Sequence, residues 1–287
     1  MTTPRISVKN VRTEYLENPL GIDVSRPRLS WQDAGEGRNI MQEAYQVQVA
    51  QDAAQFGSGR DLLWDSGKVT SDNSTYIQYG GRAGQSGQRC FWHVRVWDQD
   101  DQPSNWSDPA WWEMGMLEEK EWRADWIEVD WEEDPKAFKP CPFFRRSFAL
   151  DQPIQSARLY VTSHGLYEAW LNGKRVGDQV FTPGYTPYDK QLQYQVYDVT
   201  ALLKEGENAL GAILGDGWYR GKVYVANNRN VYGARLGLLA LLRVETIDGQ
   251  VIVATDSQWK VTTGPIVKSD MRDGEIYDAR LEMPDWC

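Results

Sequence analysis

Apolar residues occupy every second position in several short segments of this chain. Between residues 44 and 50 the alternation starts at Tyr45, and between residues 91 and 97 it starts at Trp92. Successive side chains of a β-strand point to opposite faces, so a period of two is typical of strands buried on one side. No long segment shows the 3.6-residue period of an amphipathic helix. We therefore predict an all-β fold, with His93 on the exposed side of its strand.

Turn-forming residues separate these segments. Asn172-Gly173 and Asp248-Gly249 each stand between two apolar runs, and both pairs favour the positive φ angles of a tight hairpin turn. Residues 198–203 predict one short helical turn before Gly206, with Asp198 as its cap. Short strands joined by such turns are typical of β-sandwiches.

The length of 287 residues is too great for one ordinary sandwich and suits two domains. We predict a first β-sandwich over residues 1–117, a tryptophan-rich connector over 118–142 and a second β-sandwich over 143–287. In the first domain, Trp31 in an early strand and the closing turn at Trp106 resemble features of a fibronectin type III domain. The second domain is jelly-roll-like by analogy.

Composition excludes several classes of function. The net charge of −10 disfavours nucleic acid and anionic membranes, because binding phosphate requires a basic surface. No apolar run reaches the length of a membrane span, and residues 1–8 lack the apolar core of a signal peptide, so we expect a cytoplasmic protein. Three widely spaced cysteines and two histidines form neither a disulfide framework nor a zinc-binding pattern.

Tryptophan is unusually frequent, with 14 residues. Large aromatic side chains fill half-buried sheet surfaces, and this packing role accounts best for most of them. A second role is to stack against the apolar C–H faces of sugar rings. For residues 215–219, where Trp218 and Tyr219 follow a glycine, the two roles stay equally open.

Several loops of the chain resemble those of bacterial α-L-rhamnosidases. The most specific stretch is TPGYTPYDK at residues 182–190, followed by QYQVYDVT at residues 193–200. The other matching motifs lie at residues 17–23, 27–31, 171–178, 215–219 and 273–280. They follow one another in the family's order and extend over essentially the whole chain, so the chain resembles the N-terminal region of this family.

The resemblance implies a domain order. The family has a fibronectin-like domain, a sandwich related to rhamnose-binding modules, further β domains and a large (α/α)₆ barrel. The barrel carries the two carboxylates of an inverting glycoside hydrolase that acts on terminal α-L-rhamnose. The present sequence stops at Cys287 and contains no run of helical hairpins that could build a barrel. We therefore expect no catalytic residues here and no hydrolysis by this chain alone.

The loops of the second domain carry a candidate sugar site. Such a site pairs an aromatic platform with polar groups for the ring hydroxyls, because burying an unpaired hydroxyl is costly. The candidate carbohydrate-binding residues are Asp178, Tyr185, Tyr188, Asp189, Asp216, Trp218, Tyr219 and Asn228. Glu275 and Asp278 would point to opposite faces of a strand, so we assign them to a binding or interdomain loop rather than to an acid/base pair.

Calcium is left open as a ligand of the same loops, and no other cofactor is expected. Rhamnose-binding modules related to the family hold sugar hydroxyls through a calcium ion, which needs hard oxygen ligands. The residues that could supply these oxygens are Asp178, Asp189 and Asn227, with Asp216 and Asn228 nearby in the same loops. No EF-hand spacing supports the assignment.

Three functions stay open from the sequence. The first is a carbohydrate-binding and scaffolding part of an α-L-rhamnosidase, with L-rhamnose-containing glycans and the family's catalytic domain as partners. The second is purely architectural, with domains that pack on the barrel and bind no sugar. The third is a glycosidase in its own right. An open aromatic cleft with converging carboxylates at Trp218 would favour sugar binding, and a flat apolar patch would favour the architectural role.

Overall fold

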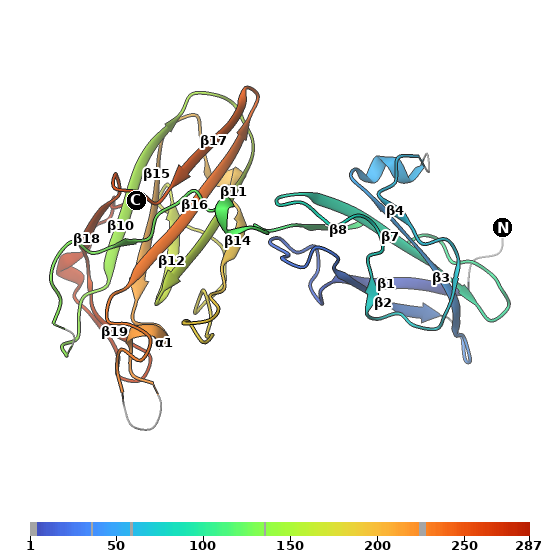
Figure 1. Cartoon of the computed structure of the whole chain (residues 1–287), viewed down its shortest axis with the longest axis horizontal. Helices are drawn as coiled ribbons and strands as arrows, with labels where there is room; N and C mark the ends of the chain where they lie inside the picture. Colours follow the sequence, from blue (N-terminus) through green and yellow to red (C-terminus); the bar gives the residue numbers. More distant parts are fainter. Residues whose placement is uncertain (1–4, 36, 58–59, 135, 224–227) are drawn as a thin grey trace. The chain divides into compact units, whose positions relative to one another are not determined.

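The chain folds into two compact units. The computed structural model describes residues 5–35, 37–57, 60–134, 136–223 and 228–287. The units comprise Met1–Glu121 and Trp122–Cys287, against an expected boundary near residue 118. Each unit is built from antiparallel sheets (Figure 1), so the prediction of two consecutive β-sandwiches is confirmed.

The first unit is a sandwich of two sheets. One sheet has the order β1-β2-β6 and the other the order β4-β3-β7-β8, with β5 paired to β3. The elements are β1 (Ile6–Thr13), β2 (Arg28–Gly35), β3 (Gln42–Ala50), η1 (Ala53–Gly57), β4 (Trp64–Asp65), β5 (Val69–Thr70), β6 (Ile77–Gln78), β7 (Arg89–Asp98), β8 (Ala110–Glu113) and η2 (Glu119–Glu121). Tyr45 of β3 pairs with Val96 of β7, and both side chains are buried, as the alternation predicts.

Tryptophans fill the core of this unit. Trp31, Trp92 and Trp112 are almost completely buried. The Trp31 indole N–H donates to Gln42 Oε1 over 2.9 Å, so that polar group is satisfied inside the core. The packing role expected for most tryptophans therefore holds for these three.

His93 is buried, contrary to the exposed position predicted for it. Its ring is stacked between Phe56 and Trp106, with centroid separations of 3.8 and 3.9 Å. Strand alternation does place His93 on the outer face of β7, but η1 and the loop at Trp106 cover that face. Desolvation, together with the positive charge of nearby Arg95, lowers the pKa of His93 to about 4.

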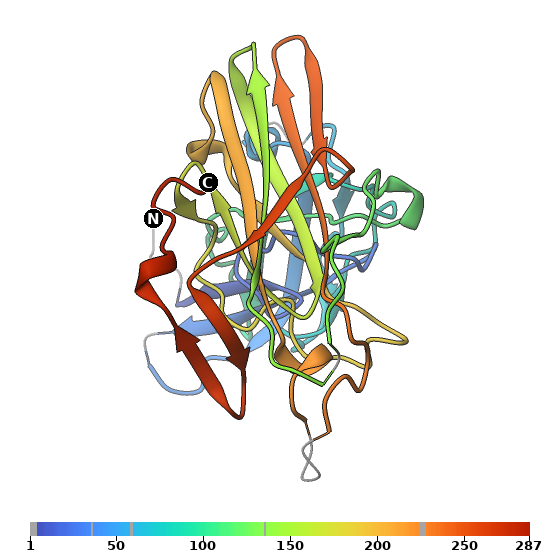
Figure 2. The ribbon, with the colours of Figure 1, turned by 90° about the vertical axis from the view of Figure 1, so that its left-hand side faces the viewer.

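The second unit has two large sheets and a separate hairpin. The sheets have the orders β13-β12-β15-β10-β18 and β14-β11-β16-β17, with β9 paired to β16. Hairpin β19-β20 stands beside them (red in Figure 2). The strands are β9 (Ile127–Glu128), β10 (Pro142–Leu150), β11 (Ile154–His164), β12 (Leu166–Leu171), β13 (Lys174–Arg175), β14 (Gln195–Asp198), β15 (Gly206–Gly215), β16 (Gly237–Thr246), β17 (Gly249–Ala254), β18 (Lys260–Thr263), β19 (Ile266–Asp270) and β20 (Gly274–Tyr277). The short helices are η3 (Thr200–Leu202), α1 (Gly217–Arg220) and η4 (Ala279–Leu281).

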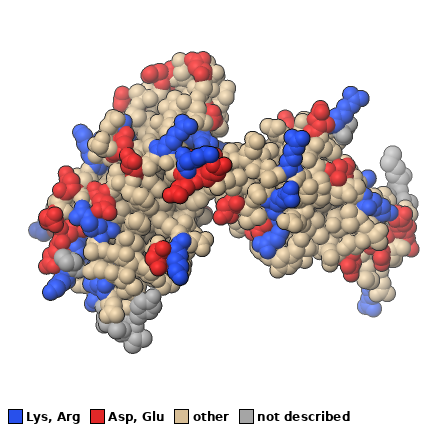
Figure 3. Space-filling view, in the orientation of Figure 1, with Lys and Arg blue, Asp and Glu red and all other residues tan. Residues whose placement is uncertain are grey.

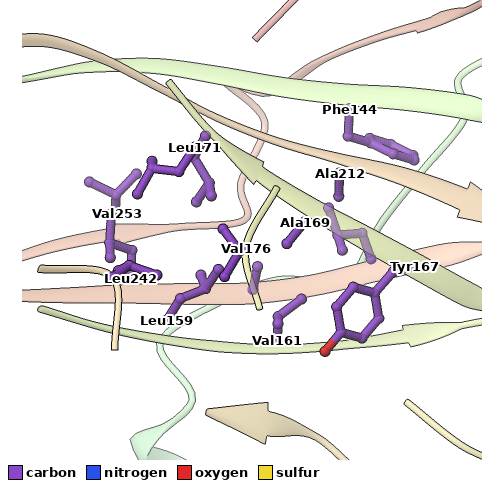
Figure 4. Close-up of a cluster of buried hydrophobic side chains, with 14 of the residues drawn as sticks. Phe144, Leu159, Val161, Tyr167, Ala169, Leu171, Val176, Ala212, Leu242 and Val253 are labelled. Atoms are coloured by element: carbon purple, nitrogen blue, oxygen red, sulfur yellow. The ribbon is translucent and has the colours of Figure 1, made fainter. Parts of the chain in front are cut away.

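The core of this unit lies between the two large sheets. Phe144, Ala169 and Ala212 come from one sheet, and Leu159 and Leu242 come from the other; all five are buried (Figure 4). Tyr167 also points into this layer. Its hydroxyl donates to Gln195 Oε1 over 2.6 Å, so the polar end of the ring is paired at the edge of the core.

Both predicted hairpins are present, but the second turn lies one residue earlier than the predicted Asp248-Gly249 pair. Asn172 and Gly173 have φ angles of 51° and 77° and connect β12 to β13. Residues 247–248 connect β16 to β17, with Gly249 at a φ of 136°. Asp198 Oδ1 accepts from the backbone N–H of Thr200 over 3.1 Å, but Val199 is the N-cap of η3, so Asp198 lies one residue before the cap position predicted for it.

The expected connector is partly wrong, because residues 122–142 of it belong to the second unit. Within residues 118–142, β9 pairs with β16 by placing Ile127 opposite Leu238. A two-residue strand shows no periodicity in the sequence, so this pairing had no local signal.

The charged surface shows no separate basic patch on the face drawn in Figure 3, where Lys and Arg lie among Asp and Glu. Among the described residues, no helix has the length and apolar character needed to cross a membrane.

Candidate functional site

The candidate site is organised around α1, the single α-helical turn among the described residues. Strand β15 ends at Gly215, and the chain then turns sharply through Gly217, which has a φ of 52°. A Cβ at Gly217 would lie 2.6 Å from Leu166 Cγ, so this turn requires glycine. The turn places Asp216 and Arg220 inside the unit, with Trp218 partly exposed between them.

A network of buried ion pairs underlies this turn. Asp216 Oδ1 accepts from Arg220 Nε over 2.7 Å, and Asp216 Oδ2 accepts from Arg229 over 2.5 Å. Arg220 also pairs with Glu133 at 2.9 Å, and Arg229 with Asp270 at 3.2 Å. These pairs join the segment before β10, α1, the loop after α1 and the end of β19.

Asp216 was predicted to bind sugar, and in the structure both of its carboxylate oxygens already have other partners. Its side chain is only 3% exposed, and both carboxylate oxygens are held by arginines. A sugar hydroxyl would have to displace a buried ion pair, and an arginine left without its partner is strongly destabilising. Asp216 is therefore a structural residue.

Asp270 anchors the other end of the network. Burial opposes its ionised form, but backbone N–H groups of Lys222, Arg272 and Asp273 donate to its carboxylate, and Arg229 lies beside it. These donors outweigh the desolvation and lower the pKa of Asp270. The carboxylate thus fixes the turn between β19 and β20 and the loop after α1 together.

An aromatic surface includes Trp218 of α1, and we define it as Phe181, Tyr185, Trp218 and Tyr232. Trp218 lies 6.0 Å from Phe181 and 5.6 Å from Tyr185, and Tyr185 lies 6.3 Å from Tyr232, measured between ring centroids. Phe181 and Tyr185 are 56% and 50% exposed. The surface is therefore a contiguous aromatic face rather than a set of isolated rings.

A second aromatic layer supports this face. Tyr188 contacts Tyr219 and Tyr232 edge to face, with centroids 5.4 and 5.0 Å apart. Tyr219 stacks on His164 at 4.7 Å, and His164 stacks on Trp126 at 4.0 Å. Tyr188 is 9% exposed, so it packs beneath the aromatic surface, and burial raises its pKa to about 12.

The structure thus brings four of the predicted residues together: Tyr185, Tyr188, Trp218 and Tyr219. Asp178 and Asp189 are exposed. Asn228 is exposed too, and its carbonyl oxygen accepts from the Val223 N–H over 3.0 Å.

The calcium assignment gains no support from the described residues. Asn227 lies outside them, and within them no three His, Cys, Asp or Glu side chains gather in a way that could hold a metal ion. Glu275 lies on β20, and Asp278 caps η4 by accepting from the Arg280 N–H. Neither of these carboxylates is part of the aromatic surface.

Sequence reasoning missed Phe181 and Tyr232 as members of this surface, and Arg220 and Arg229 as the partners of Asp216. Arg220 follows Asp216 by four residues, and an i,i+4 pair of opposite charges is a signal that was available. Phe181 precedes the recognised 182–190 motif directly but carries no pattern of its own.

Comparison with known families gives the class of each unit. Residues 8–118 match the family described as Rha78A-like, N-terminal immunoglobulin domain. Residues 152–287 match the α-L-rhamnosidase N-terminal domain. Immunoglobulin and fibronectin type III domains share the two-sheet sandwich architecture, so the first match agrees with the fold observed.

Relatives cover nearly all of this chain. An α-L-rhamnosidase from Formosa agariphila is 38% identical over 283 residues, which are 96% of this chain and 30% of the relative. The crystal structure of the Aspergillus terreus α-L-rhamnosidase superposes with a TM-score of 0.89 at 38% identity, over 98% of this chain and 32% of that one. The Streptomyces avermitilis enzyme, solved with L-rhamnose, gives a TM-score of 0.90 at 28% identity, over 98% and 43%.

The chain therefore combines the two domain types that these family models describe, and it is similar to α-L-rhamnosidases over nearly its whole length. It spans about a third of the length of the relatives it matches. These matches agree with the family resemblance of its motifs, because both family models describe N-terminal domains of such proteins.

Proposed function

We propose that this chain is an architectural part of an enzyme that releases α-L-rhamnose, and that its aromatic surface packs against the remainder of that enzyme. The relatives are α-L-rhamnosidases, and about two thirds of their length has no counterpart in this chain. The proposed partner is that remaining portion.

The observation that carries the proposal is the aromatic surface itself. Phe181 and Tyr185 are at least half exposed, and Trp218 joins them into one apolar face. Contiguous exposed apolar area in a soluble protein marks a surface that another body covers. Asp216, the carboxylate expected to turn this face into a sugar site, is held by two arginines. The combination favours an interface over carbohydrate binding at this position.

The test uses a hybrid enzyme in which this chain replaces the matching 30% of the Formosa agariphila relative. The double variant Phe181→Ser with Tyr185→Ser is compared with Ile247→Ser, because Ile247 is a 60% exposed residue in the β16–β17 turn. We expect the double variant to lower the thermal-inactivation temperature of the hybrid while leaving the melting temperature of the isolated chain nearly unchanged. Equal effects in the two contexts, or no effect in either, would contradict the proposal.

A further inference from the structure

A concave site in the second unit is a further candidate for ligand binding. Its lining residues differ from those of the aromatic surface. Strand β9 pairs with Gly237 and Leu238 at the start of β16, and β17 pairs with residues 241–246 of the same strand. Residues 255–259 then carry the chain from β17 in one sheet to β18 in the other. The space between β9 and β18 is a cavity of about 540 Å³.

The cavity has an apolar floor. Phe144 of β10, which is 1% exposed, lines it together with Ile127 and Val261, and all three pack in the core of the unit. Trp259 completes the lining. Its indole N–H donates to the Ala254 carbonyl over 2.8 Å, so the polar atom of the ring is satisfied within the protein and the ring offers apolar carbon to the cavity.

The rim of the cavity is rich in oxygen acceptors. Asp130, Asp256 and Ser257 line it, together with Glu128 and Lys260. Asp256 is held in place because its Oδ1 accepts from the Gln258 N–H over 2.8 Å. Asp130 and Ser257 are exposed to solvent at the rim. Glu128 is paired with Arg235 at 2.5 Å, and Asp256 lies 3.9 Å from Arg146. With Lys260 and Asp130 both lining the cavity, the charges at the rim are nearly balanced and favour a neutral ligand.

We infer that this cavity binds a neutral sugar ring. A sugar needs an apolar surface for its C–H face and acceptors for its hydroxyl donors, and the cavity supplies both within one space. Its volume lies within the range of small-molecule sites, about 300–1,000 Å³. The ring would lie against Trp259, with its hydroxyls donating to Asp130 and Asp256. This inference does not depend on the proposed interface, because none of the four residues of the aromatic surface lines the cavity.

The test follows the tryptophan indole N–H signals of the ¹⁵N-labelled chain while L-rhamnose is added. The Trp259 signal is assigned from the variant Trp259→Phe, and the Trp218 signal, assigned from Trp218→Phe, is the internal control. We expect the Trp259 signal to shift and to saturate in the millimolar range, while the Trp218 signal stays in place. A Trp259 signal that does not move up to about 50 mM sugar, or movement at Trp218 alone, would overturn the inference.

Two variants separate binding from folding. Trp259→Ala should weaken the affinity at least about tenfold, but this ring also packs on the core. Asp130→Ala is therefore the second variant, because Asp130 is exposed and its removal leaves the sandwich intact. We expect Asp130→Ala to weaken binding with an otherwise unchanged spectrum. Two outcomes would rule out the neutral-sugar site. One is an unchanged affinity in Asp130→Ala, and the other is a Trp259 signal that responds to the polycation spermidine and not to sugar.

Discussion

At the scale of single residues, the most consequential side chain is Asp216, because it holds two arginines at once. Arg220 and Arg229 donate to its two oxygens, and Arg220 and Asp216 are almost fully buried. The stability of the turn at α1 and of the loop after it therefore depends on one carboxylate.

Replacing Asp216 tests this dependence. We expect Asp216→Asn to lower the free energy of unfolding of the second unit by about 3 kcal/mol, because two buried guanidinium groups each lose one of their two carboxylate partners and keep only Glu133 or Asp270. The measurement is urea unfolding followed by circular dichroism. The matched control is Asp189→Asn, an exposed carboxylate, which should change the free energy by no more than about 0.5 kcal/mol. Equal losses in the two variants would argue against the network.

His93 gives a prediction about pH. Burial between Phe56 and Trp106, with Arg95 nearby, lowers its pKa from 6.5 to about 4. The unfolded chain takes up a proton near pH 6.5 and the folded chain does not, so the stability that His93 contributes is present above pH 6.5 and is lost as the pH falls toward 4.

The check is an NMR titration of the two histidine ring C–H signals, with His93→Gln to assign them. We expect the His93 signal to remain that of neutral imidazole at pH 5.5. A midpoint near 6.5 for His93 would mean that the ring is solvated and that the stack of three rings does not form.

The candidate site could be predicted from the sequence only in part, and the reason lies at the residue scale. Tyr185, Tyr188, Trp218 and Tyr219 stand in glycine- and proline-bounded loops, and that pattern marks a surface rich in aromatic rings. Whether the Asp216 carboxylate can accept from a ligand depends on Arg229, which the fold brings within 2.5 Å of it. Local sequence does not encode such a pairing.

At the scale of secondary-structure elements, the connection between β11 and β12 is the tightest in the second unit. Gly165 alone links the two strands, which belong to different large sheets. Its φ is 120°, and a Cβ there would lie 2.6 Å from the Gly215 carbonyl oxygen. Both the backbone conformation and the space therefore require glycine.

Two glycine variants separate the requirement for a positive φ angle from the requirement for space. Gly173 has a φ of 77°, but an added Cβ would find its nearest neighbour 3.6 Å away. We expect Gly173→Ala to cost about 1–2 kcal/mol, the penalty of the left-handed conformation alone. Gly165→Ala should cost clearly more, since backbone atoms would have to move. Thermal unfolding of both variants compares them, and similar melting temperatures would refute a steric role for Gly165.

The long strands and the hairpin turns could be predicted because their signals are local. Alternation marks the buried face of β3 and β7, and Asn172-Gly173 marks a two-residue turn. Strand β9 has only two residues and exists because β16 offers it an edge. The burial of His93 is of the same kind, since η1 and Trp106 cover its strand from segments distant in sequence.

At the scale of the whole molecule, the chain combines two sandwiches, each with its own buried core, and one aromatic surface that is exposed. The ion pairs beneath that surface are directed inward, and Phe181 and Tyr185 are directed outward. Such a division suits a rigid support for another domain better than a site that must bind and release a polar ligand. The cavity at Trp259, for which we propose sugar binding, lies in the same unit and shares no residue with the aromatic surface.

Hydrogen exchange measured by mass spectrometry tests the central claim most directly. The hybrid enzyme is compared with the isolated chain over residues 181–188 and 216–220, with the β16–β17 turn at Ile247 as the control segment. We expect exchange in the first two segments to slow markedly in the hybrid, because the remainder of the enzyme covers the aromatic surface, while the control exchanges equally in both. Equal exchange of residues 181–188 and 216–220 in the hybrid and in the isolated chain would contradict the architectural role.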